Sequence, residues 1–122
     1  MIISLYRTYI NMENETSETI LESVHNQIMQ SPNQNWTLQE MAKLSGYSFS
    51  HFSAIYSKQY GCSPKKDLLN ARLKMAEQLL VYSNCSIGEI AERCGFNSIY
   101  YFSKCFKKYF CVSPSEFVKE RK

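Results

Sequence analysis

The sequence predicts an all-α protein, and three observations carry this prediction. No stretch of the 122 residues alternates polar and apolar side chains in the way that a half-buried strand does. Apolar residues instead recur at helical spacing, with serine or threonine at the expected helix starts. The chain also contains an internal repeat, because residues 37–64 align with residues 86–114. The offset is 49 residues up to Phe96 and 50 residues by Phe102, so the second copy has one extra residue shortly after Gly95.

The two copies share their polar caps, small residues and aromatic residues, which predicts two small subdomains of the same fold. The aligned pairs are Thr37 with Ser86, Glu40 with Glu89, Ala42 with Ala91, Gly46 with Gly95, Tyr47 with Phe96, Phe52 with Phe102, Ser53 with Ser103, Tyr56 with Phe106 and Lys58 with Lys108.

Two helices are predicted before the repeats. Apolar residues from Ile2 to Ile10 have helical spacing, and we interpret this stretch as the tail of an upstream domain. It is too short to span a membrane, and Arg7 interrupts it. After a polar linker, Thr16 or Ser17 caps a second helix, which ends near residue 31. Its apolar face consists of Ile20, Leu21, Val24 and Ile28.

Each copy of the repeat predicts a pair of helices. A hydroxyl residue followed three positions later by glutamate forms a capping box and starts a short helix. A glycine ends that helix, because the chain turns there through positive φ. The second helix covers about residues 49–60 in the first copy and 98–110 in the second. The residues that carry these signals are Thr37, Glu40 and Gly46 in the first copy and Ser86, Glu89 and Gly95 in the second.

A serine followed by proline predicts a helix start after each copy, at Pro64 and at Pro114. The helix after Pro64 is amphipathic over about 19 residues, or about 28 Å, and connects the two copies. A short helix around Phe117 closes the fold, which gives about seven helices when the N-terminal stretch is not counted. The predicted domains are an N-terminal segment at 1–15, a first subdomain at 16–63, the connector helix at 64–83 and a second subdomain at 84–122.

Three single residues have a predicted structural role. Trp36 stands before the first capping box and should pack across it. Arg72 should pair with a carboxylate in the connector region, and His25 should lie at the surface or the boundary of the core, without a ligand.

The spacing within each copy predicts a helix-turn-helix. Two helices that cross near a right angle need a small residue at the crossing, a glycine at the turn and a large apolar residue on the second helix. In proteins that read DNA, the second helix of such a pair enters the major groove, and successive reading helices lie about 34 Å apart. A connector of about 28 Å fits that separation. The three positions hold Ala42, Gly46 and Phe52 in the first copy and Ala91, Gly95 and Phe102 in the second.

Charge is distributed unevenly along the chain, whose net charge is +3. Residues 1–35 hold one arginine and four glutamates, a balance of −3, and the rest holds thirteen Lys/Arg against seven Asp/Glu, a balance of +6. A basic surface suits a polyanion such as nucleic acid, although a solvated helix face is the plainer explanation of charge alone.

The two repeats, their Ser-Pro ends and the connector segment ARLKMAEQLL resemble the DNA-binding domain of the AraC/XylS family of bacterial transcription regulators. The second copy, IGEIAERCGFNSIYYFSKCFKKYFCVSP, is similar to the signature region of that family. The resemblance implies two helix-turn-helix units that bind adjacent major grooves of double-stranded DNA. It also implies a cytoplasmic regulator, usually an activator that contacts RNA polymerase, whose isolated DNA-binding domain is monomeric and does not associate with membranes.

The resemblance further implies which residues meet DNA. The early turns of the second helices would contact bases, and lysines farther along would contact phosphates, with solvated surface residues as the alternative. For Tyr100 and Tyr101, the alternative is that one of them packs inside. The base-contacting residues would be Ser50, His51, Ser53, Ala54, Ile99, Tyr100, Tyr101, Ser103 and Lys104, and the phosphate-contacting residues Lys58, Lys107 and Lys108.

Two positions depart from the family pattern. Family members often have arginine where Ala54 stands, so the first reading helix lacks one bidentate guanine contact. They often have glycine where Cys111 stands, and we expect the cysteine to change the loop before Ser113.

Two other classes of protein are alternatives to a DNA-binding regulator. A helical protein-interaction module without sequence-specific DNA binding would share the crossing geometry, and salt-sensitive DNA binding would distinguish it. An enzyme or redox protein would need a nucleophile with a base or clustered ligands. The five cysteines are 23, 9, 11 and 6 residues apart, with no CxxC pair. We therefore expect no enzymatic activity, no cofactor and no metal, and free thiols in a reducing compartment.

Overall fold

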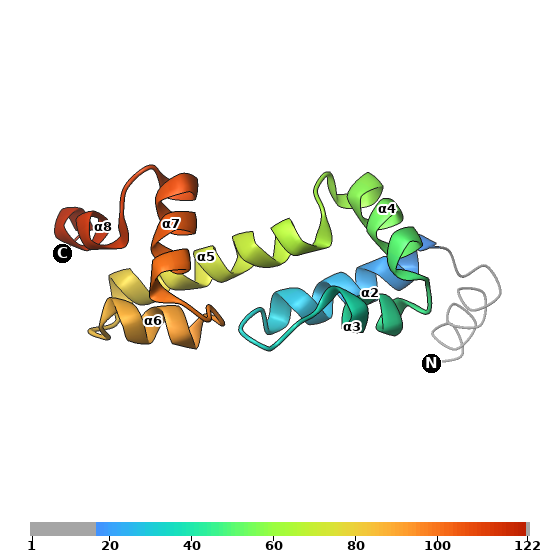
Figure 1. The fold of residues 1–122 in the computed structure, drawn as a ribbon, viewed down its shortest axis with the longest axis horizontal. Coiled ribbons are helices and arrows are strands. Elements are labelled where there is room, and N and C mark those ends of the chain that lie inside the picture. Colours follow the sequence, from blue (N-terminus) through green and yellow to red (C-terminus); the bar gives the residue numbers. More distant parts are fainter. Residues whose placement is uncertain (1–16, 122) are drawn as a thin grey trace, which may run out of the picture. The chain divides into compact units, whose positions relative to one another are not determined.

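The computed structural model describes residues 17–121, and this part of the chain contains seven helices and no strand (Figure 1). The all-α prediction is confirmed. The predicted helical face from Ile2 to Ile10 and the cap residue Thr16 lie outside the described residues. The helices are α2 (Ser17–Gln30), α3 (Leu38–Ser45), α4 (Phe49–Tyr60), α5 (Pro64–Tyr82), α6 (Ile87–Arg93), α7 (Ile99–Phe110) and α8 (Pro114–Arg121).

The chain forms two compact units whose boundary does not follow the order of the sequence. Among the described residues, one unit contains 17–30 together with Thr37–Pro64. The other contains Ser31–Trp36 together with 65–121. The short segment between α2 and α3 therefore belongs to the second unit, although both of its ends continue into helices of the first.

The first unit is built from α2, α3 and α4, which pack on one another. Three residues of the predicted apolar face of α2 are buried, and Ile20 is half-buried. The buried residues of this unit include Leu21, Val24, Ile28, Met41, Ala42, Phe52 and Tyr56.

His25 is half-buried on α2, as expected of a boundary residue, and it contacts two tyrosines of α4. Its Nδ1 lies 2.9 Å from the hydroxyl of Tyr56. Its ring stacks on that of Tyr60, with the ring centroids 4.2 Å apart. These contacts connect α2 with α4. His25 provides the hydrogen-bond partner that the hydroxyl of the buried Tyr56 needs.

The second unit has one hydrophobic core to which α5, α6, α7 and α8 all contribute. The buried residues of this core are Leu73, Ala76, Leu80, Ile90, Ala91, Cys94, Phe96, Phe102, Phe106 and Phe117. Four of them are phenylalanines, and their rings meet at centroid distances of 5.0–5.7 Å, the usual range for favourable aromatic pairs.

Equivalent hydrogen bonds start the helices of the two copies. Thr37 accepts from the backbone N–H of Glu40 at 3.1 Å, and Ser86 accepts from that of Glu89 at 3.2 Å. These bonds confirm the hydroxyl half of each predicted capping box. The second helices are capped in the same way by Ser48 and Ser98, whose hydroxyls each accept a backbone N–H three residues on at 3.2 Å.

The second helices of the two copies also end alike. Gly61 follows α4 with φ of 78°, and Cys111 follows α7 with φ of 70°. Each backbone N–H closes the last turn, Gly61 on the carbonyl of Ser57 at 2.9 Å and Cys111 on that of Lys107 at 2.7 Å. The expectation that Cys111 changes this loop is therefore wrong, because the cysteine adopts the left-handed conformation that glycine adopts in the first copy.

Candidate nucleic-acid interface

Helix α7 buries one side in the second unit and leaves the other side open. Phe102 and Phe106, one turn apart, are completely buried. Ile99, Tyr100 and Tyr101, in the first turn, have 52%, 76% and 46% of their surface exposed. Neither tyrosine therefore packs inside the unit, which settles the alternative left open by the sequence. The other two predicted base-contacting residues of this helix are half-buried Ser103 and exposed Lys104.

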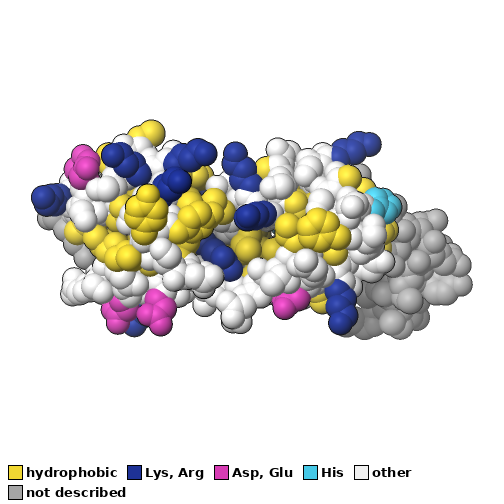
Figure 2. Space-filling view, in the orientation of Figure 1, with side chains coloured by type: hydrophobic (Ala, Val, Ile, Leu, Met, Phe, Trp, Pro, Cys, Tyr) yellow, Lys and Arg dark blue, Asp and Glu magenta, His cyan; other side chains and the backbone are white. Residues whose placement is uncertain are grey.

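The lysines of α7 continue the same open side toward the end of the helix. Lys104, Lys107 and Lys108 are exposed, and they follow Tyr100 at intervals of four, seven and eight residues. Residues at these intervals share one face of a helix. Figure 2 shows cationic side chains beside hydrophobic ones around α7, with acidic side chains toward the edges of this face. Such a surface attracts a polyanion and offers flat apolar groups to it.

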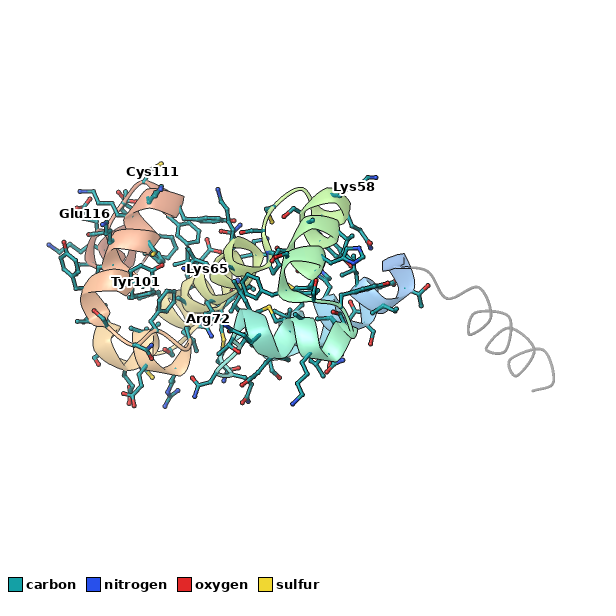
Figure 3. The ribbon with its side chains drawn as sticks, turned by 45° about the vertical axis from the view of Figure 1, so that its right-hand side comes forward. Lys58, Lys65, Arg72, Tyr101, Cys111 and Glu116 are labelled. Atoms are coloured by element: carbon teal, nitrogen blue, oxygen red, sulfur yellow. The ribbon has the colours of Figure 1, made fainter. Side chains whose placement is uncertain are left out.

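Helix α4 has the same construction with fewer charges. Phe52 and Tyr56 are completely buried on its inner side. Ser50, His51 and Ala54 are exposed, and Ser53 is half-buried. The ring of His51 packs beside that of Tyr47, with centroids 4.8 Å apart, so the side chain has a preferred position. Lys58, labelled in Figure 3, is the one lysine or arginine in α4. Helix α7 has three lysines.

All twelve predicted contact residues are therefore available at the surface, because none of them is buried. They collect in two groups, one on the open side of each second helix. The contacts with DNA themselves remain predictions.

Tyr101, in the first turn of α7, interacts with Cys105 and Arg72. A side-chain hydrogen bond with Cys105, one turn along the helix, raises the pKa of Tyr101 above its ordinary value. The guanidinium of Arg72, on α5, interacts electrostatically with the tyrosine and acts in the opposite direction. Figure 3 shows both labelled side chains in the same region of the second unit.

Within residues 17–121, Arg72 bonds backbone carbonyls and no carboxylate, contrary to the prediction. Its Nε donates to the carbonyl of Pro32 at 2.7 Å, and its Nη2 donates to the carbonyl of Gln34 at 2.8 Å. Burial lowers the pKa of the guanidinium. Sequence reasoning missed these partners because they are backbone atoms 40 and 38 residues away, and a backbone carbonyl has no residue-type signature.

Trp36 belongs to the same short segment as Pro32 and Gln34, the two residues that accept hydrogen bonds from Arg72. Its indole Nε1 donates to the carbonyl of Ser31 at 2.8 Å, and the side chain is half-buried. The predicted packing of this ring across the first capping box stays a prediction.

Residues 17–121 contain no group of three or more His, Cys, Asp or Glu side chains that could hold a metal ion. None of the helices described is both long enough and apolar enough to cross a membrane.

Comparison with known proteins identifies the family. Residues 41–120 match a family described as helix-turn-helix domain. A protein of Haemophilus influenzae described as an uncharacterized HTH-type transcriptional regulator is 36% identical over 92 residues, which are 75% of this chain and 31% of that protein. The lactose operon transcription activator of Staphylococcus xylosus is 36% identical over 81 residues, which are 66% of this chain and 29% of that protein. The chain thus spans less than a third of the length of these two curated relatives.

A solved structure agrees with this assignment. A transcriptional regulator of Chromobacterium violaceum, described as an AraC-type DNA-binding domain-containing protein, superimposes with a TM-score of 0.77 at 27% identity. The match covers 86% of this chain and 94% of that one. The family match, these relatives and the shared fold show that the chain belongs to the AraC/XylS family through its tandem helix-turn-helix domain.

Proposed function

We propose that this chain is a sequence-specific double-stranded DNA-binding regulator of transcription, which reads two adjacent major grooves with α4 and α7. The observation that carries the proposal is the open side of α7. There Tyr100, Tyr101 and Lys104 stand clear of the core, and two further lysines follow at helical spacing. Family membership supports the same conclusion.

The two reading helices would contribute differently to binding. On α7, Lys104 would reach base edges, while Lys107 and Lys108 would neutralise phosphates and supply affinity for any sequence. On α4, His51 and the serines would read bases without an arginine at position 54. Because the helices differ, the preferred site would consist of two unlike half-sites and would lack the symmetry of a palindrome.

One relative supports activation as the direction of regulation. The Staphylococcus xylosus relative is described as a transcription activator, which supports activation by this chain as well. An activator bound beside a promoter would contact RNA polymerase. The regulator would work in the cytoplasm, and the isolated domain would bind as a monomer, since one chain already has two reading helices.

The proposal is tested by measuring DNA binding as a function of salt concentration, together with selection of bound sequences from a random duplex pool. Each neutralised phosphate changes the slope of log K against log salt by about −0.9. The three phosphate-contacting lysines, Lys58, Lys107 and Lys108, should therefore give a slope of about −2.7. The selected pool should contain two unlike motifs about one helical turn apart.

A protein-interaction module is the alternative that one observation favours, namely the exposed apolar surface of Ile99 and Tyr100. Such a module would bind random and selected duplexes equally and weakly. A flat salt slope and a pool without enriched motifs would favour this alternative over DNA reading.

A further inference from the structure

The segment Ser31–Trp36, here named the bracket, is a folded part of the second unit. Its backbone closes on itself, since the N–H of Gln34 donates to the carbonyl of Ser31 at 3.2 Å. The indole of Trp36 donates to that same carbonyl at 2.8 Å. Pro32 is buried. These bonds give the bracket a defined shape, so its remaining carbonyls point in fixed directions.

Arg72 holds the bracket from the connector helix α5. Its planar guanidinium donates two hydrogen bonds, at 2.7 and 2.8 Å, to the carbonyls of Pro32 and Gln34. Two parallel donors on a rigid group fix both distance and orientation, which a lysine ammonium cannot do. Arg72 is half-buried; its bond to Pro32 is partly buried, and its bond to Gln34 is exposed.

The turn of the second helix-turn-helix lies directly against this assembly. Gly95 has φ of 92°, and a Cβ atom built on it would lie 3.0 Å from Nε of Arg72 and 3.1 Å from the carbonyl oxygen of Asn33. The equivalent glycine of the first copy, Gly46, has φ of 79°, and nothing lies within 4 Å of a Cβ built there. Both glycines have positive φ, and only the second one lies against Arg72 and the bracket.

The supported turn leads straight into the residues that face DNA. Phe96 follows Gly95, and its ring lies 5.0 Å from that of Phe102 and 6.2 Å from that of Tyr101. Arg72 also interacts electrostatically with Tyr101. A shift of the turn would therefore move the first turn of α7, where the predicted base contacts of the second copy begin.

We propose that Arg72 is a positioning residue for DNA reading: by fixing the bracket behind the Gly95 turn, it sets the orientation in which α7 presents Tyr101 and its neighbours. The inference rests on the proposed DNA-binding function and adds to it that the second reading helix is preorganised by a segment from the first half of the chain. Arg72 itself touches no base.

The experiment compares the unmodified chain with its Arg72→Lys variant. The variant keeps the positive charge but cannot form the pair of hydrogen bonds to the carbonyls of Pro32 and Gln34. Bound sequences are selected from a random duplex pool, and dissociation constants are measured for single base changes in each half-site. In Arg72→Lys, the penalty for a wrong base in the half-site read by α7 should fall by roughly threefold or more. Preferences in the half-site read by α4, and the salt slope, should stay unchanged.

Gly95→Ala and Gly46→Ala form a matched pair of further variants. Both place a methyl group on a glycine with positive φ, so both strain the backbone. The methyl group at Gly95 additionally pushes against Arg72 and the bracket, so this variant should lose preference in the half-site of α7, as Arg72→Lys does. Gly46→Ala should leave the preference of that half-site as it is in the unmodified chain.

The outcomes separate the inference from the proposed function. If the unmodified chain selects no sequence, the proposed function fails. If it selects two motifs and Arg72→Lys keeps the full preference in both, the positioning role of Arg72 is wrong. Equal losses in both half-sites also overturn it, because they indicate a general defect. Base preference is a ratio within the bound pool, so a lower folded fraction alone does not change it.

Discussion

Cys111 ends α7 in a conformation that an L-amino acid adopts at a cost. Its φ of 70° lies in the left-handed region, where a side chain crowds the following carbonyl, at a cost of about 1–2 kcal/mol. Glycine avoids this crowding but loses more conformational entropy on folding. We therefore expect Cys111→Gly to raise the free energy of unfolding by about 0.5–1 kcal/mol, measured by urea denaturation.

Gly61 provides the reverse experiment in the other copy. It has almost the same φ, and a Cβ built on it meets nothing within 4 Å. Gly61→Cys should therefore lower the free energy of unfolding through the backbone conformation alone. If Cys111→Gly has no effect or Gly61→Cys is neutral, the strain at Cys111 is relieved in some way that the backbone does not reveal.

Cys94 links stability to alkaline pH. Its side chain is completely buried, and burial raises the pKa of its thiol from 9.0 to about 11, while nearby Arg72 acts in the opposite direction. The unfolded chain releases this proton near pH 9, and the folded chain holds it until about pH 11. The stabilisation is thus present in full below pH 9 and is lost as pH rises through this window.

The corresponding measurement is urea denaturation at several pH values between 8 and 11. Stability should fall across the window, and Cys94→Ala should show a smaller fall, although its absolute stability is lower. Tyrosines and lysines titrate in both proteins, so the difference in slope isolates the thiol. Parallel curves for the two proteins would contradict this role of Cys94.

At the scale of the element, α7 should separate sequence preference from general affinity. Lys104 stands near the bases in the proposed complex, and Lys107 stands near the phosphates. We expect Lys104→Ala to weaken discrimination between bases in the half-site of α7 by about 1–3 kcal/mol at the affected position. We expect Lys107→Ala to weaken cognate and random DNA about equally and to reduce the salt slope by about 0.9.

Both lysines are exposed, so neither change should disturb the core, and each variant serves as the control for the other. Binding titrations on cognate and random duplexes at several salt concentrations give all the numbers needed. Equal losses on both duplexes for both variants would show that the contacts are assigned wrongly.

Helix α4 offers the opposite experiment, a gain of discrimination. Ala54 is exposed on the open side of α4, where members of this family often have arginine. An arginine there can form two hydrogen bonds to guanine, so Ala54→Arg should add a preference for guanine of about 1–3 kcal/mol at one position. The measurement is sequence selection by the variant. A gain in affinity without a new preferred base would mean that the side chain reaches phosphates only.

Most of the elements were predictable because their signals are local. Capping hydroxyls, the glycines of the turns and the two Ser-Pro starts act within four residues, and the observed bounds of α4 and α5 agree with the predicted ones. Helix α7, the equivalent of α4 in the second copy, was predicted to begin at Ser98. Ser98 is instead its N-cap residue, and the helix begins at Ile99. The geometry at Cys111 was mispredicted, since residue type alone does not reveal that the turn tolerates a cysteine.

At the scale of the whole molecule, the contacts that sequence reasoning missed join distant parts of the chain. The partners of Arg72 are backbone carbonyls, and His25 bonds a tyrosine 31 residues away. No periodic pattern encodes such pairs. The predicted contact residues came from the family resemblance, and the structure places all of them outside the buried core of their units.

The connector leads to a prediction about the spacing of the half-sites. The helix α5 has 19 residues, or about 28 Å, and a helix cannot stretch. Inserting five base pairs between the half-sites should abolish high-affinity binding, because the second half-site then faces the other side of the duplex. Inserting ten base pairs restores the facing side but adds about 34 Å, so binding should not recover.

Binding to these three duplexes is compared at one salt concentration. Recovery of full affinity with ten added base pairs would mean that a flexible linker joins the two helix-turn-helix units. Undiminished binding with five added base pairs would mean that a single helix-turn-helix unit supplies all the affinity.

The bracket has a consequence for recombining such regulators. A chimera joined at Pro64 would combine the bracket of one parent with the Arg72 and Gly95 counterparts of the other. Its C-terminal half would come entirely from one parent, but the bracket that packs against the Gly95 turn would come from the other parent. Hybrids that transplant residues 31–36 together with everything after Pro64 should keep the donor's base preference in the half-site read by α7. Hybrids joined at Pro64 alone should show a weaker base preference there.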